Sequence, residues 1–256
     1  MPSGGEREAF LTADYNAEMI EHIERHPGVR DRSIFIGEPA DIIPLCFGKD
    51  LPAMRDWVPK HFDFPGYVMG EHPRLFGSRT QLRHALGYST DQKVCIVTVG
   101  GSGVGTHLIR RILQAWPIVK SKIPEMRMIV VAGPRIDPLS LSAPAGVEVC
   151  AFVPDLDRHL AACDLAVVQG GLTTCMELTA AGTPFIYFPL RNHFEQNFHV
   201  AHRLDRHRAG RRMEFAISNA EVIAEAMIDT LRAPVQFEPV PYNGAERAAR
   251  LIAEFF

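Results

Sequence analysis

Two glycine-rich stretches in this chain have the composition of anion-binding loops. The first covers residues 99–106 (Val-Gly-Gly-Ser-Gly-Val-Gly-Thr), and the second covers residues 168–174 (Val-Gln-Gly-Gly-Leu-Thr-Thr). Each follows an apolar run and precedes a stretch with helical spacing. Glycine lets the backbone approach a ligand closely, and the free N–H groups at a helix start attract negative charge. Each stretch is therefore a candidate site for a phosphate or diphosphate.

The first loop departs from two common phosphate-binding motifs. Thr106 stands where Gly-x-Gly-x-x-Gly requires its third glycine, and no acidic residue follows the next apolar run to hold a ribose. The chain also lacks a Gly-Lys-Ser/Thr sequence, which excludes a P-loop. Taken alone, the loop is equally consistent with a tight turn that binds nothing. Two such loops in one sheet favour a nucleotide-type ligand.

A carboxylate accompanies the second loop. Glu177 falls in the first turns of the helix that follows, where it can favour the helix dipole or accept two hydrogen bonds from a ribose diol. We expect Thr173 or Thr174 to cap this helix.

A third loop carries a polar cluster, Glu195, Gln196 and Asn197, directly after a buried strand. Carboxylate and amide groups together suit sugar hydroxyls, which both donate and accept hydrogen bonds. The same residues also fit a helix start, with Asn192 as its cap and Glu195 in a capping box.

Five short apolar runs supply the elements that would position these loops. They cover residues 94–99, 128–132, 147–152, 164–168 and 184–188. Most are apolar without interruption, which is typical of parallel strands covered on both faces. The stretches between them have helical spacing, for example residues 108–116, which we expect to stop at Pro117. Repeated strand–helix units predict an α/β fold with a doubly wound parallel sheet over residues 79–232, with ligands beyond the carboxyl ends of its strands.

The segments on either side of residues 79–232 lack the repeated strand–helix pattern. Residues 1–78 predict a helix at 15–25 and a strand at 33–36, and then five prolines are expected to break regular structure. We interpret this stretch as an incomplete N-terminal segment, the tail of a domain plus a linker. Residues 233–256 predict a C-terminal tail with a helix from 243 to 256.

Composition excludes several classes of protein. With 46% hydrophobic and 22% charged residues in 256, the chain is too apolar for a disordered tail, and a net charge of −3 argues against a nucleic-acid partner. No apolar run is long enough to predict a membrane span or a signal peptide. Five cysteines without a Cys-x-x-Cys pair indicate a reduced, cytoplasmic chain.

The three loops, in this order, resemble the nucleotide-sugar-binding half of GT-B glycosyltransferases. The likeness is to the family of the peptidoglycan N-acetylglucosaminyltransferase that makes lipid II, and UDP-glucuronosyltransferase-like enzymes share much of it. It covers residues 92–232, is most specific over 170–196, and continues weakly over 30–70. The resemblance implies a Rossmann-like C-terminal half of a GT-B fold. It also implies transfer of a sugar from a nucleotide diphosphate sugar, UDP-linked in the family, to an acceptor hydroxyl.

The resemblance also implies roles for single residues. The matching positions are Gly101 and Ser102 near the donor diphosphate, Phe152 and Val153 at the base, Gly171, Leu172 and Thr173 in the second phosphate-side loop, Glu177 at the ribose, and Glu195, Gln196 and Asn197 at the donor sugar. There are two departures: Glu195 stands where glucuronosyltransferase-like enzymes have Asp, and Gly170 stands where the lipid II enzyme has Ser.

The expected mechanism needs no cofactor and no metal, because helix N-termini can stabilise the charge of the leaving diphosphate. Asp155 and Asp157, the close acid pair on a loop, are expected to cap a helix. The base that deprotonates the acceptor belongs, in the resembled family, to the N-terminal acceptor domain, and the resemblance implies that residues 1–78 are a remnant of that domain plus a linker. His107 and His193 are the candidates here, and each also fits a structural or donor-contacting role.

The expected partners are a nucleotide-sugar donor and an acceptor, with a lipid-linked acceptor as one alternative. The basic residues at 202–212 fit a lipid phosphate, and hence the periphery of a membrane, or a solvated helix end. The acceptor domain would come in cis or from a separate subunit, so we expect this chain to bind a donor but not to complete transfer alone. The alternatives are a non-catalytic nucleotide-sugar-binding subunit and a nucleotide-sugar epimerase.

Overall fold

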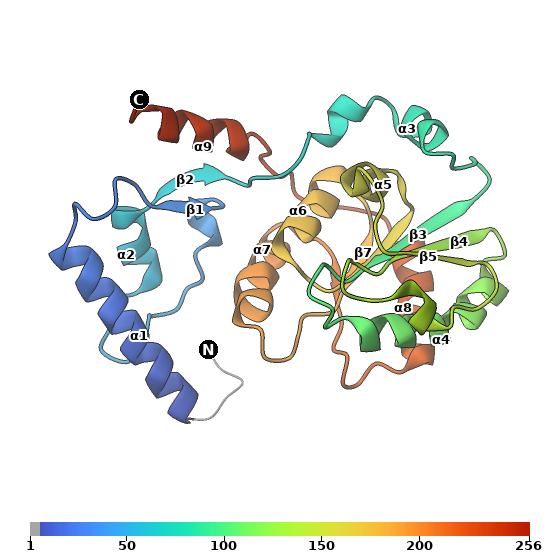
Figure 1. Ribbon diagram of the computed structural model, residues 1–256, viewed down its shortest axis with the longest axis horizontal. Helices are drawn as coiled ribbons and strands as arrows, with labels where there is room; N and C mark the ends of the chain where they lie inside the picture. The colour runs from blue at the N-terminus through green and yellow to red at the C-terminus, as the bar shows by residue number, and fades with distance from the viewer. Residues whose placement is uncertain (1–5) are drawn as a thin grey trace. The chain divides into compact units, whose positions relative to one another are not determined.

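The computed structural model describes residues 6–256, and the chain divides into two compact units (Figure 1). Unit 1 contains the residues up to Met69 together with Arg191–Arg203 and Pro241–Phe256. Unit 2 contains Gly70–Leu190 and Leu204–Val240. The boundaries of 79 and 232 for a donor-binding domain stay a prediction.

Unit 2 is built on a six-stranded parallel sheet with the order β5-β4-β3-β6-β7-β8. The strands are β3 (Lys93–Thr98), β4 (Met126–Val131), β5 (Val147–Cys150), β6 (Leu165–Val168), β7 (Phe185–Tyr187) and β8 (Arg211–Arg212). The chain starts at β3, adds β4 and β5 on one side, and then continues with β6 on the other. The doubly wound α/β prediction is confirmed, and the reversal of strand order lies between β3 and β6, which is where such sheets bind ligands.

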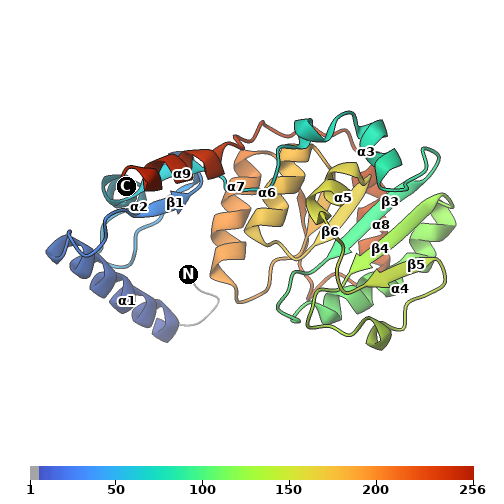
Figure 2. The same cartoon turned by 45° about the horizontal axis from the view of Figure 1, so that its top comes forward.

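Helices cover both faces of this sheet (Figure 2). They are α3 (Arg79–Ala85), α4 (Thr106–Lys122), α5 (Leu156–Ala162), α6 (Leu172–Ala181), α8 (Ala220–Arg232) and the short helices η2 (Pro73–Phe76) and η3 (Pro138–Leu141). α4 and α8 pack together on one face, and α5 packs against α6. Fully buried side chains such as Ile112 of α4, Val97 of β3 and Ile223 of α8 form one core. Each buries enough apolar surface to contribute about 1.5–3 kcal/mol relative to an exposed position.

The predicted helix stop at Pro117 is wrong, because α4 continues through this residue to Lys122. Proline removes one helical hydrogen bond and crowds the preceding turn. Here the buried residues Trp116 and Val119 hold both sides of Pro117 against the sheet, while Pro117 itself is exposed. Packing of the apolar face therefore outweighs the local preference.

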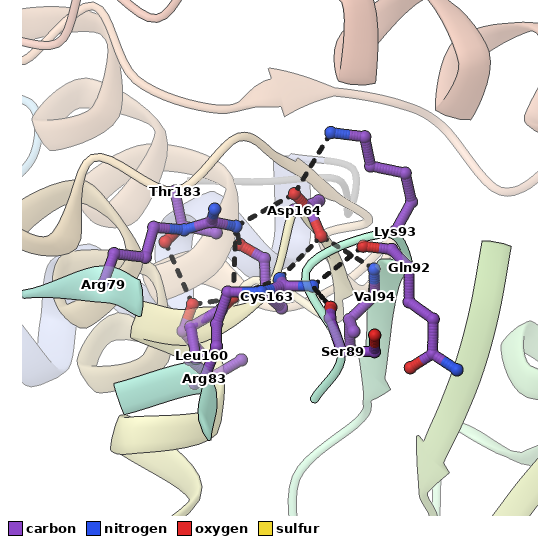
Figure 3. Close-up of polar contacts among 11 residues, drawn as sticks. Arg79, Arg83, Ser89, Gln92, Lys93, Val94, Leu160, Cys163, Asp164 and Thr183 are labelled. Atoms are coloured by element: carbon purple, nitrogen blue, oxygen red, sulfur yellow. Dashed lines mark hydrogen bonds and ion pairs between the residues drawn. The ribbon is translucent and has the colours of Figure 1, made fainter. Parts of the chain in front are cut away.

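A buried carboxylate fixes the amino ends of β3 and β6 (Figure 3). Asp164, just before β6, accepts a hydrogen bond from the Val94 N–H at 2.8 Å and pairs with Arg83 at 2.9 Å and Arg79 at 3.0 Å. Although burial alone raises the pKa of Asp164, the Val94 N–H and the Arg79 guanidinium bring that pKa below its usual value. Arg83 also donates to the carbonyl of Ser89, so α3 is tied to the segment that enters the sheet.

Unit 1 holds the remaining elements. They are α1 (Glu6–Arg25), β1 (Ile34–Ile36), η1 (Pro39–Asp41), α2 (Met54–His61), β2 (Asp63–Gly66), a π-helix η4 (Glu195–Val200) and α9 (Gly244–Ala253), and the chain passes from unit 1 to unit 2 within α7 (Ala201–Arg206). β1 and β2 form a parallel pair. The expectation that prolines break regular structure here is wrong at Pro59, inside α2, and at Pro65, inside β2.

The core of unit 1 contains the buried Trp57 and a buried acid. Asp41 accepts hydrogen bonds from the Tyr67 hydroxyl at 2.6 Å and the Glu38 N–H at 2.7 Å, and it lies 3.7 Å from the guanidinium of Arg203. Arg203 also donates to the Ile36 carbonyl at 2.8 Å. These contacts join the residues before Met69 to the segment at 191–203.

Candidate functional site

The loop after β3 is a tight turn that requires glycine at defined positions. A Cβ on Gly105 would lie 2.2 Å from the Cβ of Val99, and a Cβ on Gly133 would lie 2.4 Å from the carbonyl oxygen of Gly100. These two glycines allow the loops after β3 and β4 to pack. Gly101 and Ser102, by contrast, are exposed, and their N–H groups donate to no acceptor within residues 6–256.

The N-termini of α4 and α6, both in unit 2, lack a side-chain cap and also an acidic residue in the first turn. Gly105 takes the cap position of α4 and Gly171 that of α6. The expected cap at Thr173 or Thr174 is therefore wrong, because both threonines lie inside α6. Both helices keep the positive ends of their dipoles without a compensating negative charge.

The two uncapped helix starts follow neighbouring strands. β3 and β6 are paired in parallel, with Thr98 opposite Val168, so the loops 99–106 and 168–174 leave the same edge of the sheet. Gly170 has φ of +87°, and a Cβ at this position would lie 3.4 Å from Cδ2 of Tyr187. A Cβ on Gly171 would meet nothing within 4 Å, so the backbone beside the start of α6 is open. The loops at this edge contain Gly101, Ser102, Gly171, Leu172 and Thr173, whose contacts with a donor stay a prediction.

The loop after β5 presents an aromatic side chain at the same edge. Phe152 is 75% exposed, and Val153 beside it is partly buried. The Gly133 N–H donates to the Ala151 carbonyl at 3.0 Å, which holds this loop against the end of β4. Asp155 takes the cap position of α5 in a left-handed conformation, but its side chain makes no capping bond, which corrects the expected role. An exposed phenyl ring can stack on a planar group such as a nucleobase.

Glu177, in the second turn of α6, lies in an unusual electrostatic environment. Burial raises its pKa to about 7, the carboxylate of Asp157 adds to this rise, and a hydrogen bond from the Gly70 N–H opposes it. Sequence reasoning missed the contacts with Asp157 and Gly70. Both residues are remote from Glu177 in sequence, and only the packing of α5 on α6 and the path of the chain before α3 bring the groups together.

The remaining predicted residues belong to unit 1, apart from His107. Glu195 is exposed, Gln196 is buried, and the Asn197 side chain donates to the His193 carbonyl at 2.9 Å. The expected capping box of Asn192 and Glu195 is wrong: the helix begins after Phe194, with no side-chain bond at that cap position. Instead the ring Nδ1 of His193 accepts a hydrogen bond from the Gln196 N–H at 3.4 Å.

His107 lies on the exposed face of the first turn of α4, next to the first glycine loop. Among the side chains that the structure describes, those of residues 12–256, there is no group of three or more His, Cys, Asp and Glu arranged to hold a metal ion. Within the same residues, no helix has the length and apolar character needed to cross a membrane.

Comparison with known families matches most of this chain. The family model described as the glycosyltransferase family 28 C-terminal domain matches residues 94–252. An uncharacterised glycosyltransferase of Methanopyrus kandleri is 26% identical over 195 residues, covering 73% of this chain and 53% of that protein. A UDP-N-acetylglucosamine–N-acetylmuramyl-(pentapeptide) pyrophosphoryl-undecaprenol N-acetylglucosamine transferase of Alkaliphilus oremlandii is 32% identical over 130 residues, covering 46% of this chain and 35% of that protein.

Solved glycosyltransferase structures share the fold. The glycotransferase of kitacinnamycin superposes over 99% of this chain and 63% of its own, with a TM-score of 0.59 and 20% identity. The calicheamicin glycosyltransferase CalG4 superposes over 93% of this chain and 55% of its own, with a TM-score of 0.55 and 17% identity. This chain spans about half the length, or less, of the curated relatives it matches.

Proposed function

Because the chain belongs to glycosyltransferase family 28 through that family's C-terminal domain, we propose that unit 2 binds the nucleotide diphosphate sugar from which a sugar is transferred. The observation that carries the proposal is the pair of uncapped helix N-termini, of α4 and α6, at the ends of two adjacent parallel strands. Two such groups of free N–H donors at one sheet edge suit the two negative phosphates of a nucleoside diphosphate.

The proposed chemistry follows from where charge develops. As the bond from the sugar to the diphosphate breaks, negative charge grows on the leaving phosphate oxygens. The N–H groups of Gly101 and Ser102 and those at the start of α6 are already oriented, so they stabilise this charge without rearranging. Phe152 would stack on the base and Glu177 would accept the ribose hydroxyls.

The acceptor is a second part of the proposal. We propose a hydroxyl on a lipid-linked molecule, supported by the pyrophosphoryl-undecaprenol acceptor in the name of the Alkaliphilus relative. A base on a complementary acceptor domain, in the same polypeptide or on another, would take the proton from this hydroxyl. In a preparation that also contains the complementary acceptor domain, transfer of radiolabelled sugar to an undecaprenyl diphosphate-linked glycan would support this acceptor, and transfer only to water-soluble acceptors would contradict it.

Calorimetric titration tests donor binding directly. UDP, TDP, ADP and GDP are each titrated into the wild-type chain, into Glu177→Gln, and into Glu225→Gln, a control on the exposed face of α8. We expect UDP to bind best, Glu177→Gln to weaken it about tenfold through loss of a charged acceptor, and Glu225→Gln to match wild type. Absence of binding to all four nucleotides would refute the proposed function.

A further inference from the structure

The carboxylate of Asp157 lies beside that of Glu177, although the two residues belong to different helices. A Cβ built on Gly70 would lie 3.1 Å from Asp157 Oδ2 and 4.0 Å from Glu177 Oε1. The two carboxylate oxygens therefore border one small volume next to Gly70. Gly70 has no side chain, so no Cβ of this residue fills the space between the two carboxylates.

These two acids have few compensating partners. Glu177 accepts a hydrogen bond from the Gly70 N–H. Within residues 12–256, Asp157 accepts no hydrogen bond and forms no ion pair, so the dipole of α5, in whose first turn it lies, is its main compensation. The neighbouring cation, Arg158, pairs instead with Glu71 at 3.0 Å. Two partly buried carboxylates side by side repel each other, and hydrogen-bond donors supplied by a ligand would relieve the repulsion.

We propose that Asp157 is a second acceptor for the donor's ribose, so that the vicinal diol donates one hydroxyl to Glu177 and the other to Asp157. This inference rests on the proposed function, which places the nucleotide at this edge of unit 2. A diol offers two donors held side by side, which matches two acceptors facing one volume. The consequence is selectivity for ribonucleotides, because removing either hydroxyl leaves a carboxylate without its donor.

A divalent cation is the competing occupant, since carboxylates also bind Mg²⁺. Two carboxylates alone supply a small share of the ligands that such an ion needs, and the described residues bring no third acidic or imidazole group to them. The experiment therefore includes chelator to separate a cation from a diol.

The test compares Asp157→Asn with a matched control, Asp155→Asn. Both change one acid to its amide on the same segment, and the Asp155 side chain makes no capping bond. UDP, 2′-deoxy-UDP and 3′-deoxy-UDP are titrated calorimetrically into each protein at pH 8, with and without EDTA. Thermal unfolding midpoints of all the proteins check that the fold is intact.

We expect Asp157→Asn to bind UDP about tenfold more weakly than wild type, because a neutral acceptor replaces a charged one, and Asp155→Asn to be unchanged. One of the two deoxy analogues should bind wild type about tenfold or more weakly than UDP, and this difference should shrink to under about threefold in Asp157→Asn.

Three results would overturn the proposal. If Asp157 only repels Glu177, Asp157→Asn binds UDP as tightly as wild type or more tightly. If the acids hold a cation, EDTA abolishes the effect of the substitution. If wild type binds UDP and both deoxy analogues equally, neither carboxylate accepts a hydrogen bond from the ribose. Failure of wild type to bind any nucleoside diphosphate would instead refute the proposed function, and this inference with it.

Discussion

The raised pKa of Glu177 predicts that donor binding weakens on mild acidification. Burial and the nearby Asp157 carboxylate hold this pKa at about 7 against the Gly70 N–H, so the carboxyl is neutral below this pH and ionised above it. With that pKa, about a tenth of the groups are ionised at pH 6 and about nine tenths at pH 8. If the ionised form binds the ribose, the apparent Kd rises about tenfold from pH 8 to pH 6.

A UDP-sugar is the suitable ligand for this measurement, because it lacks the terminal phosphate whose own pKa of about 6 would interfere. Calorimetry from pH 6 to pH 8 should show the tenfold change in wild type and a flat profile in Glu177→Gln. Removing the charge of Asp157 should shift the midpoint to lower pH, because its carboxylate contributes to the rise. A flat wild-type profile, or tighter binding at pH 6, would refute the reasoning.

The same pKa has a consequence for stability that serves as an independent check. The folded protein holds Glu177 neutral at a pH where the unfolded chain ionises it. The stability that comes from the neutral Glu177 is fully present below the usual pKa of a glutamate, and it is lost as the pH rises towards the folded-state pKa of about 7. Glu177→Gln should therefore gain stability relative to wild type between pH 5 and pH 8. A constant difference in unfolding free energy across this range would contradict the pKa.

Two further predictions concern the elements that hold the site. Gly105→Ala should lower the free energy of unfolding by about 1–3 kcal/mol and weaken donor binding, because the added Cβ would overlap Val99. In Gly171→Ala the added Cβ meets nothing within 4 Å, so this variant should keep the wild-type unfolding midpoint. Asp164→Asn should cost about 3–5 kcal/mol in urea unfolding, because it leaves the buried guanidinium of Arg83 without its anion. Glu148→Gln, at an exposed ion pair, should cost under about 1 kcal/mol. Equal costs within either pair would contradict the structural assignment.

The sequence predicted the sheet of unit 2 well, because uninterrupted apolar runs leave few alternatives to buried parallel strands. It did not predict β8, whose two residues Arg211 and Arg212 are exposed and carry no apolar signal. It also ended α4 too early at Pro117. In each case tertiary contacts decide: β8 exists because β7 pairs with it, and Pro117 is tolerated because the residues around it are buried.

Local chemistry located the two glycine loops but overestimated their capping. Threonine and asparagine commonly cap helices, which is why the sequence predicts caps at Thr173 or Thr174 and at Asn192. The structure leaves the starts of α4 and α6 uncapped, and η4 also lacks a side-chain bond at its cap position. A helix start that already had its own side-chain cap would compete with a ligand for the same N–H groups. The failed capping predictions for α6 therefore support a ligand there more directly than a successful prediction would.

The proximity of Glu177 and Asp157 could not be predicted from the sequence alone. Glu177 was identifiable because its role depends on its place in one helix, which the local sequence specifies. Asp157 has the same functional group, but only the packing of α5 on α6 brings it next to Glu177. Gly70, which borders both carboxylates, comes from a third segment of the chain. Asp157 lies in the first turn of α5, where the helix dipole favours its charge, but within residues 12–256 it pairs with no cation, and it faces another acid. Its position therefore points to a ligand that supplies the missing donors.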